Sequence, residues 1–284
     1  MRFRFVAPFV ALSFVAAGAC TKKQVVQAET DIATALISDD QEEALGLALK
    51  SELDKQGIRL IDDPDVQAYV DGIGKKVFPL AQTDRKGVKW HIHVVNDDAM
   101  VNAFATPGGH LYFTTGLLLA ADDEAEVAGV LSHEAGHVVA RHSARALVQQ
   151  LGLQTVAAMA LGKNPSAVSA VAANIGASGL MLAHSRSSEH EADVFGVKYA
   201  AKAGYDPRGI VRFFQKLKAK EGKTPAVMTW LSTHPATSDR IANVERMIKA
   251  KKLTGGTRDE LRHAAVKEIL QSEKQPVRGT EPAH

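Results

Sequence analysis

The stretch Leu131-Ser132-His133-Glu134-Ala135-Gly136-His137 organises this chain, because it contains the pattern His-Glu-x-x-His. Residues four apart share one face of an α-helix, so His133 and His137 can hold one metal ion together. Glu134 lies beside them and can activate a metal-bound water, then carry its proton to a leaving amine. Zinc suits two imidazoles, and a catalytic zinc needs a third protein ligand and an open position for water. The pattern therefore requires a helix, a third ligand and a place for a substrate.

The sequence around the pattern predicts a helix from Asp122 to about Gln150. An acidic run opens it, where the helix dipole favours negative charge. Apolar residues then recur at helical spacing: Val127, Val130, Leu131 and Val138. The metal-binding pattern is thus expected inside a helix, as its chemistry requires.

A third ligand is best sought in the segment from Ser187 to Asp193. Glu189 and Asp193 are four apart on a helix predicted from Ser187 to Ala203, so both project from one face. If Glu189 ligates the metal, Asp193 can accept a hydrogen bond from a ligating histidine and fix its tautomer. Glu191 points about half a turn away and is the weaker candidate. The alternative is a charged surface helix, and the nearby metal-binding pattern favours the ligand interpretation.

Together these motifs resemble the HtpX and CAAX-prenyl-protease type of zinc metallopeptidase, a gluzincin family. Within it, the soluble periplasmic BepA-like branch is the most similar. The resemblance covers about residues 39–250. Further matching stretches are Asn102-Ala103-Phe104-Ala105, Pro107-Gly108-Gly109, Ala128-Gly129-Val130-Leu131, Arg141-His142 and Thr233-His234-Pro235 with Arg240.

The resemblance implies one zinc ion per chain, held by His133, His137 and Glu189, with Glu134 as general base. It also implies an edge strand that pairs with the backbone of an extended substrate. Such strand addition reads main-chain groups and tolerates varied side chains. The residues it assigns to this strand are Asn102, Ala103 and Phe104.

Two further residues are candidates for the catalytic machinery. The resemblance brings His234 close to the zinc, either as a removable fourth ligand that keeps the enzyme latent or as a stabiliser of the oxyanion. The alternative is a loop histidine before a helix. Arg240 is a candidate for stabilising transition-state charge, and a salt bridge on a helix surface is the other interpretation.

The predicted fold is α+β and mostly helical: a zincin-like metalloprotease domain with a small antiparallel sheet beside the motif helix. Its strands are predicted at 88–94, 102–106 and 110–114, from alternating or β-rich patterns and a Pro-Gly-Gly turn. On the first strand His91 and His93 share one face. They can bind a metal, but a solvated strand face is the favoured interpretation.

The remaining segments are expected to be mainly helical. Helices are predicted at 39–56, 63–78 and 115–121, after Asp206-Pro207, and at 238–251. Residues 151–183 are rich in small residues and predict a hairpin of two helices, over the active site or against a membrane. The peptidase domain is expected to cover residues 39–251, and residues 252–284 a C-terminal helix and a disordered tail.

The first 20 residues have the layout of a signal peptide. Basic Arg2 and Arg4 precede an apolar run and small residues that end at Cys20, the only cysteine of the 284 residues. This favours a lipoprotein signal with Cys20 as the lipidated residue, and an ordinary secretory signal is the alternative. Residues 21–38 are polar and are expected to form a tether. The net charge of +2 gives no electrostatic reason to expect nucleic acid.

The predicted function is that of a zinc-dependent endopeptidase of the bacterial cell envelope, anchored by lipid to the periplasmic side of the outer membrane. Its substrates are expected to be unfolded or misassembled polypeptides in extended form. The alternative is a zinc-stabilised chaperone or assembly factor for outer-membrane proteins, with little or no proteolysis.

Overall fold

The computed structural model describes residues 24, 27–28, 31–32, 35–151, 170, 172–173, 184–235 and 238–272. The predicted signal peptide with Cys20, the tail after Ser272 and most of the predicted hairpin at 151–183 lie outside these residues. The described helices are α2 (Asp39–Lys55), α3 (Pro64–Asp84), α4 (Thr115–Ala120), α5 (Glu124–Val139), α6 (His142–Leu151), α9 (Arg186–Lys202), α10 (Gly209–Ala219), α11 (Pro225–Thr233), α12 (Ser238–Ala250) and α13 (Glu260–Ser272). The strands are β1 (His91–Val95), β2 (Ala103–Thr106) and β3 (His110–Thr114), with a 3-10 turn at Pro107–Gly109.

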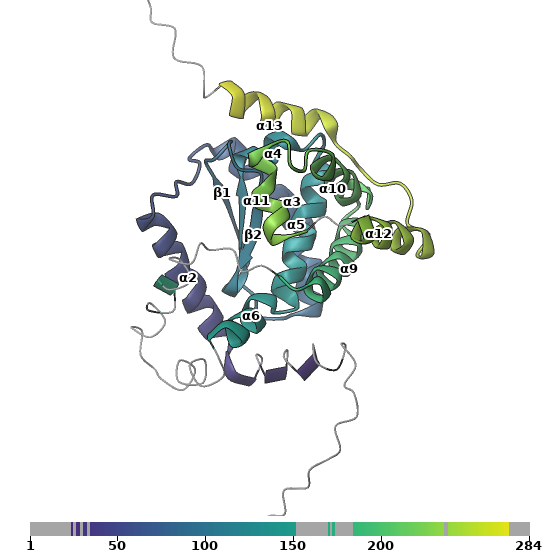
Figure 1. The fold of residues 1–284 in the computed structure, drawn as a ribbon. Coiled ribbons are helices and arrows are strands. Elements are labelled where there is room, and N and C mark those ends of the chain that lie inside the picture. Colours follow the sequence, from purple (N-terminus) through teal and green to yellow (C-terminus); the bar gives the residue numbers. More distant parts are fainter. Residues whose placement is uncertain are drawn as a thin grey trace, which may run out of the picture.

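The helix that carries the metal-binding pattern, α5, forms the centre of the molecule (Figure 1). It contacts α3, α9 and α10, and also β2 of the sheet. Every residue of α5 from Glu124 to Val138 is buried. Because the pattern lies on a helix with no solvent-facing side, its two histidines and its glutamate are removed from bulk water.

The small sheet has the strand order β1-β3-β2. β2 and β3 form the expected antiparallel pair, joined by the predicted turn, in which Gly108 and Gly109 adopt left-handed backbone angles (φ 81° and 89°) that favour glycine. The prediction of a wholly antiparallel sheet is wrong for β1, which runs parallel to β3. The chain reverses after β1 and again at the turn, so β3 inserts between the other two strands and runs in the direction of β1.

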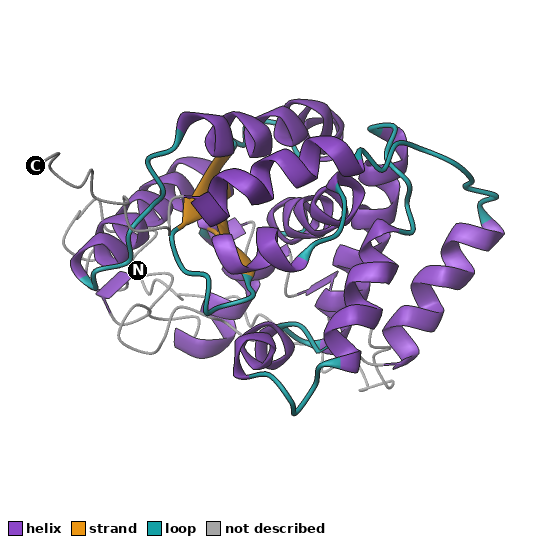
Figure 2. Ribbon diagram, turned by 90° about the horizontal axis from the view of Figure 1, so that it is seen from above, coloured by secondary structure: helices purple, strands orange, loops and turns teal. Residues whose placement is uncertain are grey.

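The two faces of the sheet meet different partners. One face contributes apolar residues to the main core, which α3 and α5 share: Ile92, Val94, Leu111 and Phe113. The other face carries the histidines of β1 and lies against α2, where Leu53 packs with Tyr112. Figure 2 shows the strands enclosed between helices. The predicted solvated face is therefore covered in large part by α2.

A break between α5 and α6 replaces the single helix predicted through His142. α5 ends at Val139, and Arg141 adopts a left-handed conformation (φ 56°). The Arg141 side chain is buried and binds Glu42, with Nε to Oε1 at 2.7 Å, and it also donates to the carbonyl of Ile37. These contacts hold the turn and direct α6 so that His142 comes back beside His137.

Two other segments differ from the prediction. Asp63 caps α3 as expected, but the helix continues past Phe78 and through Pro79 to Asp84. The predicted helices do not include α11, which begins with Pro225 in its first turn and buries Trp230 completely. A proline at the first helical position loses no helical hydrogen bond, so it starts this helix rather than preventing it.

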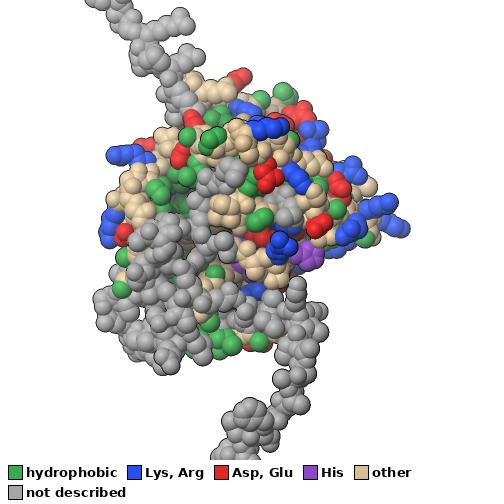
Figure 3. Space-filling model, in the orientation of Figure 1, with side chains coloured by type: hydrophobic (Ala, Val, Ile, Leu, Met, Phe, Trp, Pro, Cys, Tyr) green, Lys and Arg blue, Asp and Glu red, His purple; other side chains and the backbone are tan. Residues whose placement is uncertain are grey.

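The surface carries charges of both signs. On the face drawn in Figure 3, lysine and arginine are interspersed with aspartate and glutamate, in keeping with the net charge of +2. Among the helices of the described residues, none has the length and apolar character needed to cross a membrane.

Candidate metal centre

Helices α5 and α9 pack closely enough to bring the predicted ligands together. A Cβ atom at Gly136 would lie 2.8 Å from Cβ of Phe195 and 3.1 Å from the carbonyl oxygen of Ala192. A Cβ atom at Gly196 would lie 3.3 Å from Cα of His133. Since each helix presents a glycine to the other, their backbones approach and the first turn of α9 faces the metal-binding pattern.

The donor atoms have the spacing of a tetrahedral metal site. The Nε2 atoms of His133 and His137 are 3.1 Å apart, and the Glu189 carboxylate lies 3.4 Å from His137 Nε2 and 3.6 Å from His133 Nε2. Tetrahedral zinc with bonds of 2.0–2.1 Å holds its ligands about 3.3 Å apart. His234 adds a fourth donor, and the ligand atoms of all four residues lie within 4.8 Å of one another.

Unsatisfied polar atoms at the centre also fit a cation. Oε1 of Glu189 and Nε2 of His234 are buried and have no hydrogen-bond partner among the described residues. A buried polar atom without a partner is costly, and a bound metal ion would satisfy both atoms at once. Two imidazoles with a carboxylate form a donor set that zinc prefers.

The acidic neighbours of His133 favour a positive charge on this residue, whereas burial lowers the pKa of His137 and His234. Burial alone lowers the pKa of His133, but its hydrogen bonds with Asp193 and Glu189 outweigh burial and raise this pKa to about 9. Burial raises the pKa of Glu134 to about 7, against the opposing attraction of His133. A carboxyl group with a pKa near neutrality can both accept and return a proton.

Asp193, the residue expected from the spacing on α9 to orient a ligating histidine, lies beside His133. His133 Nδ1 lies 3.1 Å from Asp193 Oδ1. Arg240 clamps the same carboxylate with Nη2 and Nε, at 2.7 and 2.9 Å, and its Nη1 reaches Oε2 of Glu189 at 2.5 Å. Arg240 is buried, so it does not form the surface salt bridge considered as an alternative. Its contacts with two acidic groups support a positioning role.

His137 is held by a second chain of contacts, which the sequence did not predict. Its Nδ1 lies 2.8 Å from Nδ1 of His142, whose Nε2 lies 3.2 Å from Oε2 of Glu191. Arg145 Nη2 binds the same oxygen at 3.0 Å. If His137 ligates through Nε2, its Nδ1–H donates to His142, which in turn donates to the carboxylate. Glu191, the weaker ligand candidate, thus contacts His142, which lies between it and His137.

His234 is aimed at the centre by its neighbours. It is 1 % exposed, its ring stacks on Trp230 at 4.4 Å, and its Nδ1 lies 2.9 Å from Oγ1 of Thr233. Its Nε2 lies 3.5 Å from Oε1 of Glu134. This residue is therefore not an ordinary loop histidine, because its free nitrogen faces both the metal position and the base.

His184 is a further histidine at the centre, and sequence reasoning missed it. Its ring stacks on His137 with the centroids 4.0 Å apart, and it lies 5.7 Å from the ring of His234. It precedes α9 by two residues and belongs to no spacing pattern with the other ligands. Only the turn of the chain into α9 brings it there.

The predicted substrate strand lies at the edge of the sheet. In an antiparallel pair, alternate residues direct their backbone groups to the neighbouring strand. Asn102 accepts from Thr114 N, so the backbone groups of Ala103 and Ala105 point away from β3. There the Ala105 carbonyl accepts from Ser143 Oγ, and the Ala105 N–H faces Glu134, where it helps to lower the pKa of that carboxyl. Phe104 stacks on Tyr112.

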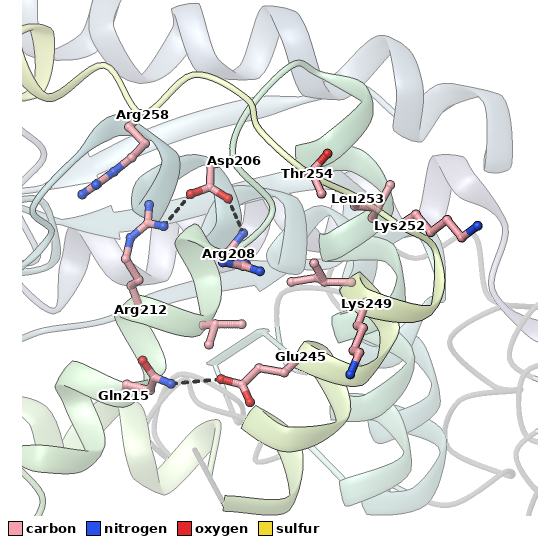
Figure 4. A pocket seen from close by; sticks show the side chains of 12 residues that line it. Asp206, Arg208, Arg212, Gln215, Glu245, Lys249, Lys252, Leu253, Thr254 and Arg258 are labelled. Atoms are coloured by element: carbon pink, nitrogen blue, oxygen red, sulfur yellow. Dashed lines mark hydrogen bonds and ion pairs between the residues drawn. The ribbon is translucent and has the colours of Figure 1, made fainter.

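A separate hollow of about 980 Å³ lies between α10, α12 and the loop after α12 (Figure 4). None of the residues of the metal centre lines it. Its polar side chains bind one another: Arg212 pairs with Asp206, and Gln215 with Glu245. The chemistry of the metal-binding pattern therefore takes place elsewhere.

Two imidazoles one helical turn apart, a carboxylate from a second helix and a buried glutamate beside them form the arrangement of a zincin-like domain. The chain belongs to peptidase family M48, which it matches over residues 64–248, more than half of its length. This confirms the resemblance inferred from the motifs. It also explains the donor set, since members of the family are zinc metallopeptidases.

Curated relatives support this assignment. The chain is 29% identical over 215 residues to the mitochondrial metalloendopeptidase OMA1 of Schizosaccharomyces pombe, covering 75% of this chain and 62% of the relative. It is 29% identical over 220 residues to the beta-barrel assembly-enhancing protease of Yersinia pestis, covering 74% and 44%. It is 39% identical over 163 residues to OMA1 of Arabidopsis thaliana, covering 56% and 32%. The chain thus spans less than two thirds of each relative.

Proposed function

We propose that this chain is a zinc-dependent endopeptidase that cleaves unfolded polypeptide. The observation that carries the proposal is the buried cluster of His133, His137 and Glu189, with the Glu134 carboxyl beside it and the edge strand β2 next to Glu134. When bound, zinc lowers the pKa of a water molecule and polarises the scissile carbonyl.

The chain's own groups have separate tasks in this reaction. The backbone groups of Ala103, which point away from β3, pair with an extended substrate and align it, with Asn102 and Phe104 fixing the strand. Glu134 takes the proton of the attacking water on its carboxylate and returns it to the leaving amine. Asp193 and Arg240 keep His133 and Glu189 in place, so that the geometry does not relax as charge develops.

A strand edge that binds a substrate through main-chain hydrogen bonds predicts a preference for unfolded substrates. Cleavage of casein should be at least about 100-fold faster than cleavage of a stably folded protein, because only the unfolded chain offers a continuous free strand. Chelation should abolish cleavage, and stoichiometric zinc should restore it. Cleavage that persists in the metal-free protein would contradict the proposal.

We further propose that His234 is a removable fourth ligand that keeps the enzyme latent. Its Nε2 belongs to the four-donor cluster and has no hydrogen-bond partner among the described residues, so it can occupy the position that water needs. His234→Ala should then raise casein cleavage several-fold while zinc is retained. A large loss of cleavage would instead assign the imidazole to oxyanion stabilisation.

The four-donor cluster also favours a second candidate function, a zinc-stabilised chaperone whose metal site is permanently closed. Under this function, Glu134→Gln should complement loss of the protein in cells, because no water is activated. Failure of the variant to complement, with normal protein levels, would exclude the chaperone as the sole function. Complementation would show that proteolysis is dispensable.

We propose a location on the periplasmic side of the bacterial envelope, with lipid attached at Cys20. The support is the signal-like sequence before Cys20 and the similarity to beta-barrel assembly-enhancing proteases. Misassembled outer-membrane proteins are then the proposed substrates. Mass spectrometry of the mature N-terminus should find an acylated cysteine. An unmodified N-terminus cleaved at another residue would contradict the anchor.

A further inference from the structure

A second cluster of histidines lies on the face of the sheet that α2 covers. His91 and His93 come from β1 and His110 from β3, and the parallel register places His91 directly opposite His110. The rings of His91 and His110 stack with centroids 4.5 Å apart, and those of His93 and His110 at 5.4 Å. This cluster, His91, His93 and His110, shares no residue with the catalytic centre and lies on a different surface of the sheet from the α5 core.

Two of these rings have a buried nitrogen atom with no hydrogen-bond partner among the described residues. His110 is 1 % exposed, and its Nδ1 lies 3.1 Å from Nε2 of His93. If His110 Nδ1–H donates to His93, the Nε2 lone pair of His110 remains available. The Nε2 atoms of both His91 and His110 are buried and have no hydrogen-bond partner among the described residues.

Helix α2 supplies an acidic group to the same place. Oε1 of Glu43 lies 3.8 Å from Nε2 of His91, which is too long for a hydrogen bond. The donor atoms of Glu43, His91 and His110 nevertheless all lie within 4.8 Å of one another. The donor atoms of the three groups are therefore close enough to hold one ion, and the contact between Glu43 and His91 leaves room for it.

The backbone of α2 packs directly against this cluster at Gly46. A Cβ atom at Gly46 would lie 2.7 Å from Cδ2 of His110 and 2.3 Å from the carbonyl oxygen of Pro107. Only glycine permits this approach, and the close contact shields one side of His110 from water. The site is thus built into the packing of α2 on the sheet, and His91, which is half-buried, leaves the other side open.

We propose that Glu43, His91 and His110 form a second metal site, for a divalent transition-metal ion of the zinc type. Two imidazoles and one carboxylate are ligands that zinc binds, with water completing four-coordination. His93 orients His110 by contacting the Nδ1 atom of His110, as partners of ligating histidines commonly do. The ion ties α2 to β1 and β3, so its role is structural and separate from the proposed peptidase reaction.

Zinc stoichiometry tests this site in the full-length mature chain. After equilibrium dialysis against zinc at neutral pH, elemental analysis should find a second equivalent in the wild type beyond the catalytic one. Glu43→Gln and His91→Gln, which alter accessible ligands, should each lose that second equivalent. Glu52→Gln, a change of the same type on the same helix, should keep it. A wild type with a single equivalent, or variants that keep both, would overturn the proposal.

A second measurement separates this site from the catalytic centre. The double variant His133→Ala/His137→Ala should retain one zinc equivalent, and zinc should raise its melting temperature. Adding Glu43→Gln to that chain should remove both effects. Glu43→Gln alone should cleave casein at the wild-type rate. The zinc content and melting temperature of the double variant do not depend on peptidase activity, so they test the second site even if the peptidase proposal fails. Absence of zinc from the double variant, with its helical content preserved, would contradict the second site.

Discussion

Each of the two metal-binding imidazoles of α5 is oriented by its own set of charged partners. His133 contacts Asp193, which Arg240 binds in turn. His137 contacts His142, which contacts Glu191. The first set follows from sequence spacing, because Glu189 and Asp193 are one turn apart on a single helix. The second could not be predicted in this way, since it depends on the left-handed turn at Arg141, which local periodicity does not indicate.

Removing His142 should weaken metal binding without removing a ligand. His142→Ala leaves the His137 Nδ1–H without its acceptor, so the ring loses its fixed orientation and zinc affinity should fall roughly 10- to 100-fold. Competition with a chromophoric chelator measures this affinity. His190→Ala, which removes an exposed histidine of α9, is the control and should leave the affinity unchanged. An unaltered zinc affinity in His142→Ala would show that this contact does not support the ligand.

At the scale of elements, the contact between α5 and α9 determines the metal centre. The helix carrying the motif, the helix carrying the third ligand and the positions of the three strands were predictable, because each has its own periodicity or turn signal. The parallel pairing of β1 and the approach of His184 were not, and the approach of His234 was expected only from the family resemblance. They depend on contacts between residues far apart in the chain, and no local pattern reports these.

Gly136 lies where the two helices are closest, so Gly136→Ala should separate them. The added methyl group would lie 2.8 Å from Cβ of Phe195, and overpacking of this kind costs typically about 1–3 kcal/mol. Chemical denaturation should show this loss, accompanied by weaker zinc binding. Gly72→Ala is the matched control, since its methyl group meets only the flexible guanidinium of Arg262. Equal stability of the two variants would contradict the close-packing account.

α13 should detach more easily at acidic pH because of His263. This histidine donates from Nε2 to the carbonyl of Ala121 and accepts from the Tyr69 hydroxyl, and burial lowers its pKa, with Lys267 acting in the same direction and Asp123 opposing it. Below pH 6.5 the unfolded chain takes up a proton that the folded chain does not. Stability is therefore present above pH 6.5 and is lost as the pH falls, by at most about 1.4 kcal/mol per unit.

Urea unfolding from pH 7.5 to 5 measures this dependence. In His263→Gln the slope of unfolding free energy against pH should be smaller than in the wild type. His190→Gln, which changes an exposed histidine, should keep the wild-type slope. Identical slopes in the wild type and His263→Gln would show that His263 does not contribute.

At the scale of the whole molecule, α5 joins the sheet to the helices that close the metal centre. Its buried position explains why one short motif predicts so much: the ligands, the base and the strand edge all lie within contact of a single central helix. The match to peptidase family M48, over residues 64–248, includes α5 and the helices and strands around it. The motif predicted zinc and a base, and the family resemblance predicted His234 near the metal, whereas the contacts of His142 and His184 with His137 depend on the tertiary structure.

The central claim is that Glu134 acts on water beside a zinc ion held by His133, His137 and Glu189. Glu134→Gln tests it most directly, because the amide keeps the size of the side chain but cannot take up the proton. Zinc content and casein cleavage should be measured on the same preparation. The account predicts unchanged zinc and a loss of cleavage of at least about 100-fold. Undiminished cleavage by zinc-loaded Glu134→Gln protein would contradict it.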